Sequence, residues 1–275
     1  MTTATVVGSG PNGLAAAIVL AEAGLEVTVV EARDTIGGGT RTAELTEPGL
    51  LHDVCSAAHP FAVASPFFRE RDFFGAEKLE LAQPEISVAH PLDGGVAGHL
   101  SQSVAESSPM LGQDARRWQQ LFGPLVQSFG DLAGDALRPL PNIPKHPLLF
   151  ARFGMLAGLS GNRLAKLFEA PETQALLGGN AAHIIRPLTR PATASVGTIL
   201  TAAAHAVGWP VPVGGSAAIT QAMADRLTGL GGCIETGREV ADIAELDADV
   251  VMLDIGPAAV LDLYGDRLPS SVSFW

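Results

Sequence analysis

Three glycines near the N-terminus have the spacing of a nucleotide-binding turn. Gly8, Gly10 and Gly13 stand in the run Gly-Ser-Gly-Pro-Asn-Gly, after the apolar residues 4–7 and at the start of a helical pattern over residues 12–23. Backbone N–H groups at the start of such a helix stabilise a pyrophosphate. Gly8 permits the tight turn, Gly10 lets the phosphates approach, and Gly13 allows the helix to pack closely on the strand.

An acidic residue completes this pattern. Val27–Val30 is a β-branched, apolar run typical of a buried parallel strand, and it is followed by Glu31, 18 residues beyond Gly13. A carboxylate at this place accepts hydrogen bonds from an adenosine ribose and repels the 2′-phosphate of NADP. A solvent-exposed acid at a strand end is the plainer interpretation, but the strand–helix–strand context favours ribose binding. The sequence therefore predicts a site for the ADP half of FAD or NAD, which share this geometry.

The glycine-rich residues 37–42, Gly-Gly-Gly-Thr-Arg-Thr, help to separate the two dinucleotides. Consecutive glycines let backbone amides turn toward an anion, and the Arg41 side chain can neutralise diphosphate charge. A flexible loop with a solvated arginine is the alternative. Together with residues 31–36, the segment resembles the second signature of FAD enzymes of the amine oxidase and carotenoid desaturase superfamily. The resemblance favours FAD, and it disfavours an NAD-binding dehydrogenase.

Further blocks resemble the phytoene desaturase-related branch, which includes bacterial carotenoid desaturases and the pyridine nucleotide-disulfide oxidoreductase domain-containing 2 type of protein. They are residues 51–61, 178–183 and 208–216. In that superfamily a proline and two glycines before a helix, then Gly-Gly-x-Ile and a hydrophobic strand pair, mark the return of the chain to the flavin domain. Pro212, Gly214, Gly215, Gly232, Ile234 and Val240 match this pattern, and the resemblance places the Val240 backbone at the adenine. The predicted cofactor-binding residues are Gly8, Gly10, Pro11, Asn12, Gly13, Glu31, Ala32, Arg33, Gly38, Gly39, Thr40, Arg41 and Val240.

The order of the elements predicts an α/β fold: a Rossmann-like, FAD-binding, doubly wound parallel sheet that is interrupted by a mostly helical substrate domain. Trp118 to Leu132 follow helical spacing, and a proline-rich connector (Pro139 to Pro147) comes next. Ser216 is typical of an N-cap for a helix that ends near Leu227. Short strands are expected at 233–236, 240–243 and 249–253. The predicted domains are residues 1–66 and 211–275 for FAD, with the partial substrate domain at 67–210.

The resemblance implies an FAD-dependent oxidoreductase, of the desaturase or dehydrogenase kind, that abstracts hydride from an apolar substrate such as a polyene or another lipid-like molecule. His59 and His183 are candidates for exchanging a proton near the flavin or the substrate, although a structural role is favoured for each. We assign no catalytic residue. Relatives of this kind are longer, and no family pattern follows Pro269. We therefore expect an N-terminal portion that alone binds FAD weakly or not at all, with a separately encoded C-terminal half, if one exists, as the partner that restores binding. A noncatalytic nucleotide-binding fragment or pseudoenzyme is the alternative.

Composition and charge exclude several classes of protein. The net charge of −12, from 17 Lys plus Arg against 29 Asp plus Glu, gives no global attraction to nucleic acid or an anionic membrane. Cys55 and Cys233 have no partners at metal-ligand spacing, which argues against a metal site or a disulfide framework and favours the cytoplasm. The apolar stretch 148–159 contains Arg152 and is shorter than the roughly 20 residues of a membrane span. It is expected to be a core helix, a substrate-tunnel lining or a peripheral membrane contact.

Overall fold

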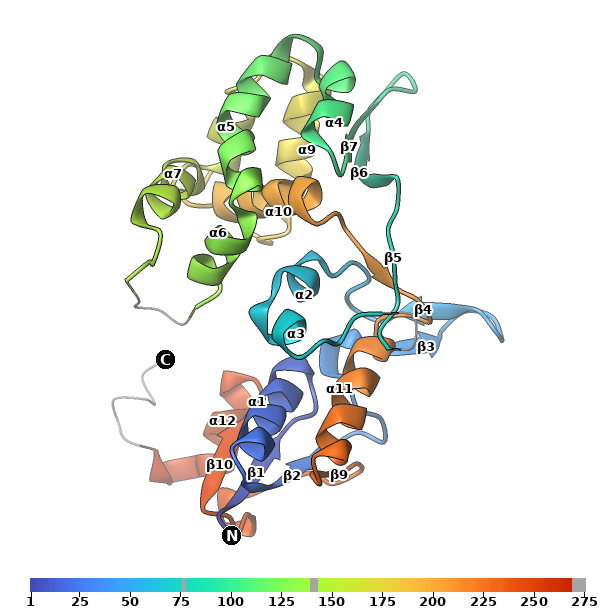
Figure 1. The fold of residues 1–275 in the computed structure, drawn as a ribbon, viewed down its shortest axis with the longest axis vertical. Coiled ribbons are helices and arrows are strands. Elements are labelled where there is room, and N and C mark those ends of the chain that lie inside the picture. Colours follow the sequence, from blue (N-terminus) through green and yellow to red (C-terminus); the bar gives the residue numbers. More distant parts are fainter. Residues whose placement is uncertain (76–77, 139–142, 269–275) are drawn as a thin grey trace. The chain divides into compact units, whose positions relative to one another are not determined.

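The computed structural model in Figure 1 describes residues 1–75, 78–138 and 143–268, and its chain divides into two compact units. Unit 1 comprises residues 1–57, 75–80 and the chain from Pro212 onward, and unit 2 comprises residues 58–74 and 81–211. The sequence pattern places the two domain boundaries after residues 66 and 210. The chain therefore leaves unit 1 after its first strands and returns to it near its C-terminal quarter.

Unit 1 is built on a four-stranded parallel sheet, which confirms the predicted α/β class. In the sheet Val6 pairs with Val29 on one side and with Met252 on the other. The strand order reverses at the first strand, as in the Rossmann arrangement, and such a reversal leaves a crevice at the carboxyl ends of the strands. The strands, in spatial order, are β10 (Val250–Leu253), β1 (Thr3–Val7), β2 (Glu26–Val30) and β9 (Cys233–Glu235).

The two helices that the sequence predicts in unit 1 begin within one residue of the predicted positions. Helix α1 (Pro11–Glu22) has proline in its first turn, where a missing N–H costs nothing, and its residues Leu14 and Ile18 are fully buried. Helix α11 (Ala217–Gly229) packs beside it and follows Ser216 directly. The Ser216 hydroxyl does not cap this helix, because it donates to the Ser56 carbonyl oxygen. The other elements of unit 1 are η1 (Gly38–Thr40), β3 (Thr42–Glu44), β4 (Leu51–Asp53), η3 (Ile243–Glu245), α12 (Pro257–Tyr264) and η4 (Gly265–Arg267).

The prediction of a strand at residues 240–243 is wrong, because the structure has no strand there. Local side-chain bonds turn the chain there: the Asp242 carboxylate accepts the Ala244 N–H at 2.7 Å, and the Glu245 carboxylate accepts the Asp242 N–H at 3.0 Å. This capping box starts η3 and competes with strand pairing. Residues 238–242 instead cross beside the end of β2, where the Arg238 N–H donates to the Glu31 carbonyl oxygen.

Unit 2 is mostly helical and has its own core. Trp118 and Phe122 are fully buried at its centre, with their rings 4.5 Å apart. The helical pattern predicted from Trp118 to Leu132 is two helices, because the backbone leaves helical geometry at Ser128. The elements of unit 2 are α2 (Pro60–Ala64), α3 (Pro66–Glu70), β5 (Leu81–Ala82), β6 (Ile86–Pro91), β7 (Ala97–Ser101), α4 (Val104–Leu111), η2 (Gly112–Asp114), α5 (Ala115–Gln127), α6 (Phe129–Ala136), α7 (Pro147–Ala157), α8 (Gly161–Ala165), α9 (Pro171–Ala182), α10 (Ala194–Ala206) and β8 (Val211–Pro212), whose second residue falls in unit 1.

A polar pair is buried in the core of unit 2. The Trp118 indole N–H donates to Nε2 of His205 at 3.0 Å, and Nδ1 of the same ring lies 3.1 Å from the Ser101 carbonyl oxygen. These partners place the ring proton on Nδ1 and leave Nε2 as the acceptor. Burial lowers the pKa of His205 to about 4, against the opposing effect of the Ser101 and Gln102 backbone. The imidazole is therefore neutral at physiological pH.

Two features of the sequence fall outside what the structure describes. Pro139 and Pro141 of the predicted connector, and the C-terminal residues 269–275, lie outside the described residues. No helix among the residues that are described combines the length and the hydropathy needed to span a bilayer.

Candidate functional site

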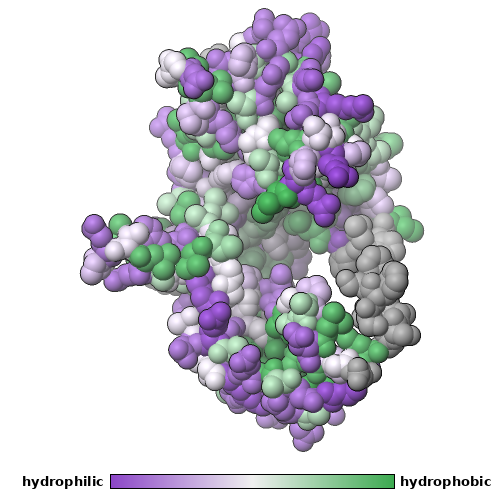
Figure 2. Space-filling view, turned by 180° about the vertical axis from the view of Figure 1, so that it is seen from behind, coloured by the Kyte–Doolittle hydropathy of each residue, from purple (hydrophilic) through white to green (hydrophobic). Residues whose placement is uncertain are grey.

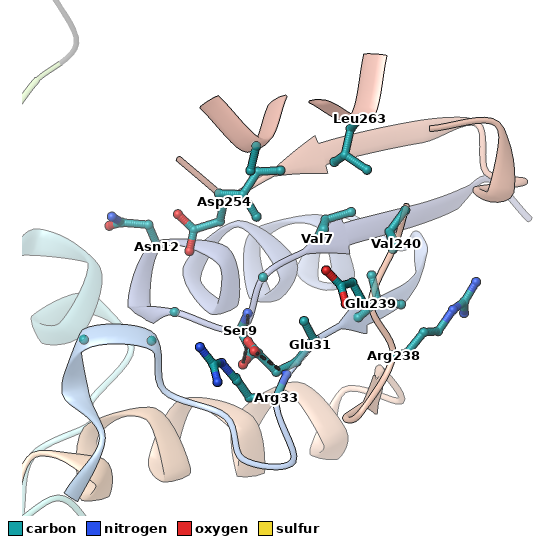
Figure 3. Close-up of a pocket in the computed structure, with 18 of the residues that line it drawn as sticks. Val7, Ser9, Asn12, Glu31, Arg33, Arg238, Glu239, Val240, Asp254 and Leu263 are labelled. Carbon is teal, nitrogen blue, oxygen red and sulfur yellow. Dashed lines mark hydrogen bonds between the residues drawn. The ribbon is translucent and has the colours of Figure 1, made fainter. Parts of the chain in front are cut away.

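A pocket of about 730 Å³ opens in unit 1, at the carboxyl ends of β1 and β2 (Figure 3). This is the crevice where the strand order reverses, and the volume is in the range of small-molecule sites. Five segments form its wall: the turn from β1 to α1, the residues after β2, η1 with Arg41, the irregular residues 238–241, and the segment from β10 into α12. All of them belong to unit 1.

The glycines of the first turn are required by close backbone contacts. Gly8 has a φ of +101°, which disfavours any L side chain, and a Cβ there would lie 2.4 Å from the Asp254 carbonyl oxygen. A Cβ at Gly13 would lie 2.2 Å from the Gly8 carbonyl oxygen. The turn therefore brings the start of α1 tightly against the end of β1, and Pro11 and Asn12 of its first turn line the pocket.

Glu31 lies beside this turn, as the nucleotide-binding pattern requires. Its Oε2 accepts the Ser9 backbone N–H at 3.0 Å and the Ser9 hydroxyl at 2.6 Å, and Figure 3 shows the Ser9 and Glu31 side chains next to each other. Its Oε1 accepts the Arg33 N–H at 2.9 Å and Nη2 of Arg41 at 3.2 Å. A carboxylate has about four acceptor positions. All of those on Glu31 are thus filled by protein donors.

The hydrogen bonds hold Glu31 ionised. Burial alone raises the pKa of this carboxyl, but the bonds from Ser9 and Arg33, together with the charge of Arg41, outweigh it and lower the pKa below its usual value. A fixed negative charge therefore stands at the end of β2, in the wall of the pocket.

Arg41 is bonded mainly to its own loop. Its Nη2 donates to the Thr35 carbonyl oxygen at 2.7 Å and its Nη1 to that of Gly38 at 3.1 Å, besides the ion pair with Glu31. The Arg41 side chain is 25% exposed and that of Glu31 10%. Of the side chains that donate to Glu31, Arg41 is the accessible one, because Ser9 is fully buried.

Asp254 is a pocket residue that the sequence did not single out. It follows β10, and its Oδ2 accepts the Gly13 N–H at 2.7 Å, so its carboxylate lies at the N-terminal end of α1 (Figure 3). A Cβ at Gly10 would lie 2.9 Å from the same oxygen. The favourable helix dipole and the N–H bond stabilise this anion. The signal in the sequence is its position, directly after the strand predicted at 249–253.

Eleven of the thirteen predicted cofactor residues line the pocket, and Gly13 and Thr40 do not. Thr40 is buried behind the wall, where its hydroxyl donates to the Gly37 carbonyl oxygen. That any of the thirteen contacts a cofactor stays a prediction. The eleven are Gly8, Gly10, Pro11, Asn12, Glu31, Ala32, Arg33, Gly38, Gly39, Arg41 and Val240. Lining residues that the sequence analysis did not name as cofactor contacts are Val7, Ser9, Val30, Arg238, Glu239, Ala241, Asp254, Ile255, Ala259, Asp262 and Leu263.

The two histidines considered as candidates for proton exchange, His59 and His183, belong to unit 2. His59 precedes α2, and its backbone N–H donates to the Pro210 carbonyl oxygen. The His183 ring packs edge-on against Trp209, with centroids 5.9 Å apart, at the end of α9. Neither lines the pocket of unit 1. Among the described residues there is no cluster of His, Cys, Asp and Glu able to hold a metal ion.

Comparisons with known proteins agree with the resemblance seen in the sequence. The family model of an NAD(P)-binding Rossmann-like domain matches residues 6–70. A hydroxyneurosporene desaturase from Cereibacter sphaeroides is 29% identical over 286 residues, which cover 93% of this chain and 56% of the desaturase. The chain thus spans little more than half the length of that relative.

Solved structures share the fold of the chain. An oxidoreductase from Methanosarcina mazei matches with a TM-score of 0.64 at 21% identity, over 97% of this chain and 62% of its own. A protein from Pyrococcus furiosus matches with a TM-score of 0.60 at 20% identity, over 98% and 63%. A putrescine oxidase variant made in a redesign of cofactor binding matches with a TM-score of 0.58 at 21% identity, over 99% and 62%.

Proposed function

We propose, for a chain that is similar to FAD oxidoreductases of the carotenoid desaturase and amine oxidase type, that the pocket of unit 1 binds the ADP half of FAD. The observation that carries the proposal is the placement of Glu31: an ionised carboxylate at the end of β2, bonded to Ser9 of the glycine turn. The residue that contacts the ribose and the turn that contacts the diphosphate then lie next to one another in one pocket, as an ADP group requires.

Ribose binding requires that one hydrogen-bond donor to the Glu31 carboxylate be replaced by a ribose hydroxyl. Since its acceptor positions are filled, a ribose hydroxyl must replace one donor, and the partly exposed Arg41 side chain is the one able to leave. The released guanidinium remains at the pocket wall, where a diphosphate supplies new acceptors for it. Arg41 thus neutralises Glu31 before binding and the diphosphate afterwards.

The same carboxylate selects among dinucleotides. A 2′-phosphate on the ribose would place its charge beside Glu31, which disfavours NADP and other 2′-phosphorylated nucleotides. The fully buried Ser9 fixes Glu31 in this position by two hydrogen bonds, so the carboxylate cannot turn away to relieve the repulsion.

For the whole protein we propose an FAD-dependent oxidoreductase that removes hydride from a largely apolar substrate. Bound FAD supplies the hydride acceptor in such chemistry. Support for an apolar, polyene-like substrate comes from the relative that is named for hydroxyneurosporene. In this proposal unit 1 holds and orients the nucleotide, and a cytoplasmic location is proposed with it.

The proposal is tested on the purified chain by two measurements. We expect ADP to bind in calorimetric titration and to be displaced by FAD, and adenosine 2′,5′-bisphosphate to bind at least tenfold more weakly than ADP. A visible absorbance spectrum of the protein as purified reports whether flavin is carried. ADP binding with no affinity for FAD favours the noncatalytic nucleotide-binding alternative. Absence of binding by every nucleotide contradicts the site itself.

The Arg41→Gln variant tests the exchange of partners. We expect the affinity for ADP to fall about tenfold, because one charge-assisted contact to the diphosphate is lost, at about 1.5–3 kcal/mol for such a bond, and this is partly offset by freeing an acceptor position on Glu31. Adenosine lacks the diphosphate, so its affinity should rise or stay the same. An equal loss for adenosine and ADP would show that Arg41 supports the fold of the loop and not the phosphate. The conservative Arg41→Lys variant should restore part of the ADP affinity.

A further inference from the structure

Asp254 places a carboxylate at the start of α1, where the diphosphate is proposed to bind. Its Oδ2 accepts the Gly13 N–H at 2.7 Å, and a Cβ at Gly10 would lie 2.9 Å from the same oxygen. The carboxylate therefore covers the backbone of the first turn of α1. It also lines the pocket of unit 1, so a nucleotide bound there would meet it.

The first turn of α1 has few N–H groups to offer an anion. Pro11 has no N–H, and the Leu14 N–H already makes a helical hydrogen bond. The N–H groups of Asn12 and Gly13 remain, and Asp254 accepts that of Gly13. An anion that binds at this helix start therefore meets a resident carboxylate that uses the same donors.

The Asp254 carboxylate has no ion-pair partner in the part of the chain that the structure describes. Its Oδ2 has the Gly13 N–H, and its Oδ1 has no hydrogen-bond partner among these residues. Glu31, across the turn, differs in this respect because it forms an ion pair with Arg41. The charge of Asp254 is therefore balanced mainly by the N-terminal end of α1, which a diphosphate would also use.

The order of the strands places Asp254 and Glu31 on opposite sides of the turn from β1 to α1. Strands β10 and β2 flank β1, and Asp254 follows β10 whereas Glu31 follows β2. Figure 3 shows Asp254 near Asn12, on the other side of the turn from Glu31. A nucleotide with its ribose at Glu31 and its diphosphate on the turn therefore directs its β-phosphate toward Asp254.

The β-phosphate differs between two classes of adenine nucleotide. In FAD and ADP-ribose the diphosphate is esterified at both ends, and the β-phosphate continues into a polyol or a sugar, whose hydroxyls can donate to a carboxylate. In ADP and ATP the phosphate chain ends in a free phosphate, which carries about −1.5 to −2 charges at neutral pH. A carboxylate beside the β-phosphate repels the second class more strongly.

We propose that Asp254 makes the pocket select nucleotides whose diphosphate is esterified at both ends over free ADP and ATP. This selectivity rests on the proposed binding of the ADP half of FAD in the same pocket. Glu31 disfavours an additional phosphate on the ribose, and Asp254 disfavours additional phosphate charge at the other end of the diphosphate. The two carboxylates thus act on opposite ends of the ADP group.

Calorimetric titration of the purified chain with adenosine, ADP-ribose, ADP and ATP tests the proposal. A chelator is present so that no metal ion bridges the two anions. For the unaltered chain we expect ADP-ribose to bind about tenfold more tightly than ADP or ATP at low salt, because its diphosphate carries less charge toward Asp254. High salt should reduce this preference.

The Asp254→Asn variant removes the charge and keeps an acceptor oxygen for the Gly13 N–H. We expect its affinity for ADP and ATP to rise about tenfold and that for ADP-ribose to rise about threefold or less, since the repulsion scales with the charge of the phosphates. Adenosine has no phosphate, so its affinity should stay the same. The preference for ADP-ribose over ADP should therefore largely disappear.

The Glu47→Gln variant is the matched control for net charge. Glu47 is exposed in the hairpin of β3 and β4, and its side chain makes no hydrogen bond or ion pair with another described residue. Figure 2 shows this hairpin at its left edge, and its residues do not line the pocket. The variant removes one negative charge away from the site, so it should bind all four ligands as the unaltered chain does.

Three outcomes would overturn the proposal while the nucleotide site stands. They are an unchanged affinity of Asp254→Asn for ADP, an equal loss for all four ligands, which would assign Asp254 to holding the turn, and an equal gain in Glu47→Gln. If none of the four ligands binds the unaltered chain, the nucleotide site and the selectivity are both refuted. Circular dichroism verifies that each variant is folded.

Discussion

Replacing Glu31 by glutamine is expected to lower the affinity for ADP at least a hundredfold. The substitution removes the charge that attracts the ribose hydroxyls and places an amide NH2 where a carboxylate oxygen now accepts bonds. In one orientation this NH2 faces the Ser9 donors, and in the other it faces the Arg33 N–H and Arg41. Either orientation leaves donors unpaired, at about 1–3 kcal/mol each. Calorimetric titration with ADP measures the first effect, and urea unfolding measures an expected destabilisation of about 2–4 kcal/mol.

The Glu31→Asp variant is the control for this prediction. It keeps the negative charge but shortens the side chain, so it should lose the two bonds from Ser9 or the two on the other oxygen while retaining repulsion of a 2′-phosphate. We expect intermediate ADP affinity and the same preference for ADP over adenosine 2′,5′-bisphosphate. If the glutamine variant binds ADP as tightly as the unaltered chain, the ribose is not at Glu31.

The free energy of unfolding is expected to fall by about 3 kcal/mol when the pH is lowered from 6.5 to 4, because of His205 alone. The folded state holds this imidazole neutral, with a pKa of about 4, whereas the unfolded chain protonates it near the ordinary value of 6.5. Between these values the unfolded state binds the additional proton, so the free energy of unfolding decreases as pH falls, at about 1.4 kcal/mol per pH unit. Urea unfolding at several pH values measures the slope.

Two variants separate the titration of His205 from its packing. His205→Gln cannot be protonated, and its amide retains a polar partner for the Trp118 indole, so the slope between pH 4 and 6.5 should flatten by about the amount given above. Trp118→Phe removes the indole N–H but leaves the histidine buried, so it should lower stability at every pH and keep the slope. An unchanged slope in the glutamine variant would show that other groups titrate in this range.

The parts of the fold that were predictable from the sequence rest on short-range patterns. The β1–α1–β2 unit follows from residues 4–31, where strand, glycine turn, helix and acid succeed one another within about one βαβ length. The expected strand at 249–253 is also found, as β10 (Val250–Leu253) at the edge of the sheet, although its residues are only partly buried there. Periodicity failed at residues 240–243, where the apolar and β-branched pattern was overridden by the capping box of Asp242.

The parts of the site that were missed depend on contacts between distant residues. Asp254 reaches Gly13 across 241 positions, and no spacing rule connects them. Ser9 lies inside the glycine motif at a variable position, so its hydroxyl bond to Glu31 follows only from the packed turn. The role of Arg41 was anticipated as a diphosphate contact, but the ion pair that holds it to Glu31 is visible only in three dimensions.

The division of the sheet between the two ends of the chain determines the order in which it is completed during synthesis. Ala4 pairs with Val27 soon after both leave the ribosome, but its other partner, Val250, is made only after the roughly 150 residues of the intervening unit. Val250 follows Val27 by about 220 residues, so at about 5–20 residues per second the delay is on the order of ten to forty-five seconds. For this time β1 and β2 have open edges, and Gly13 has no Asp254 beneath it. The nucleotide pocket is therefore completed only after unit 2 has been made, and β1 and β2 need protection from pairing with other chains until then.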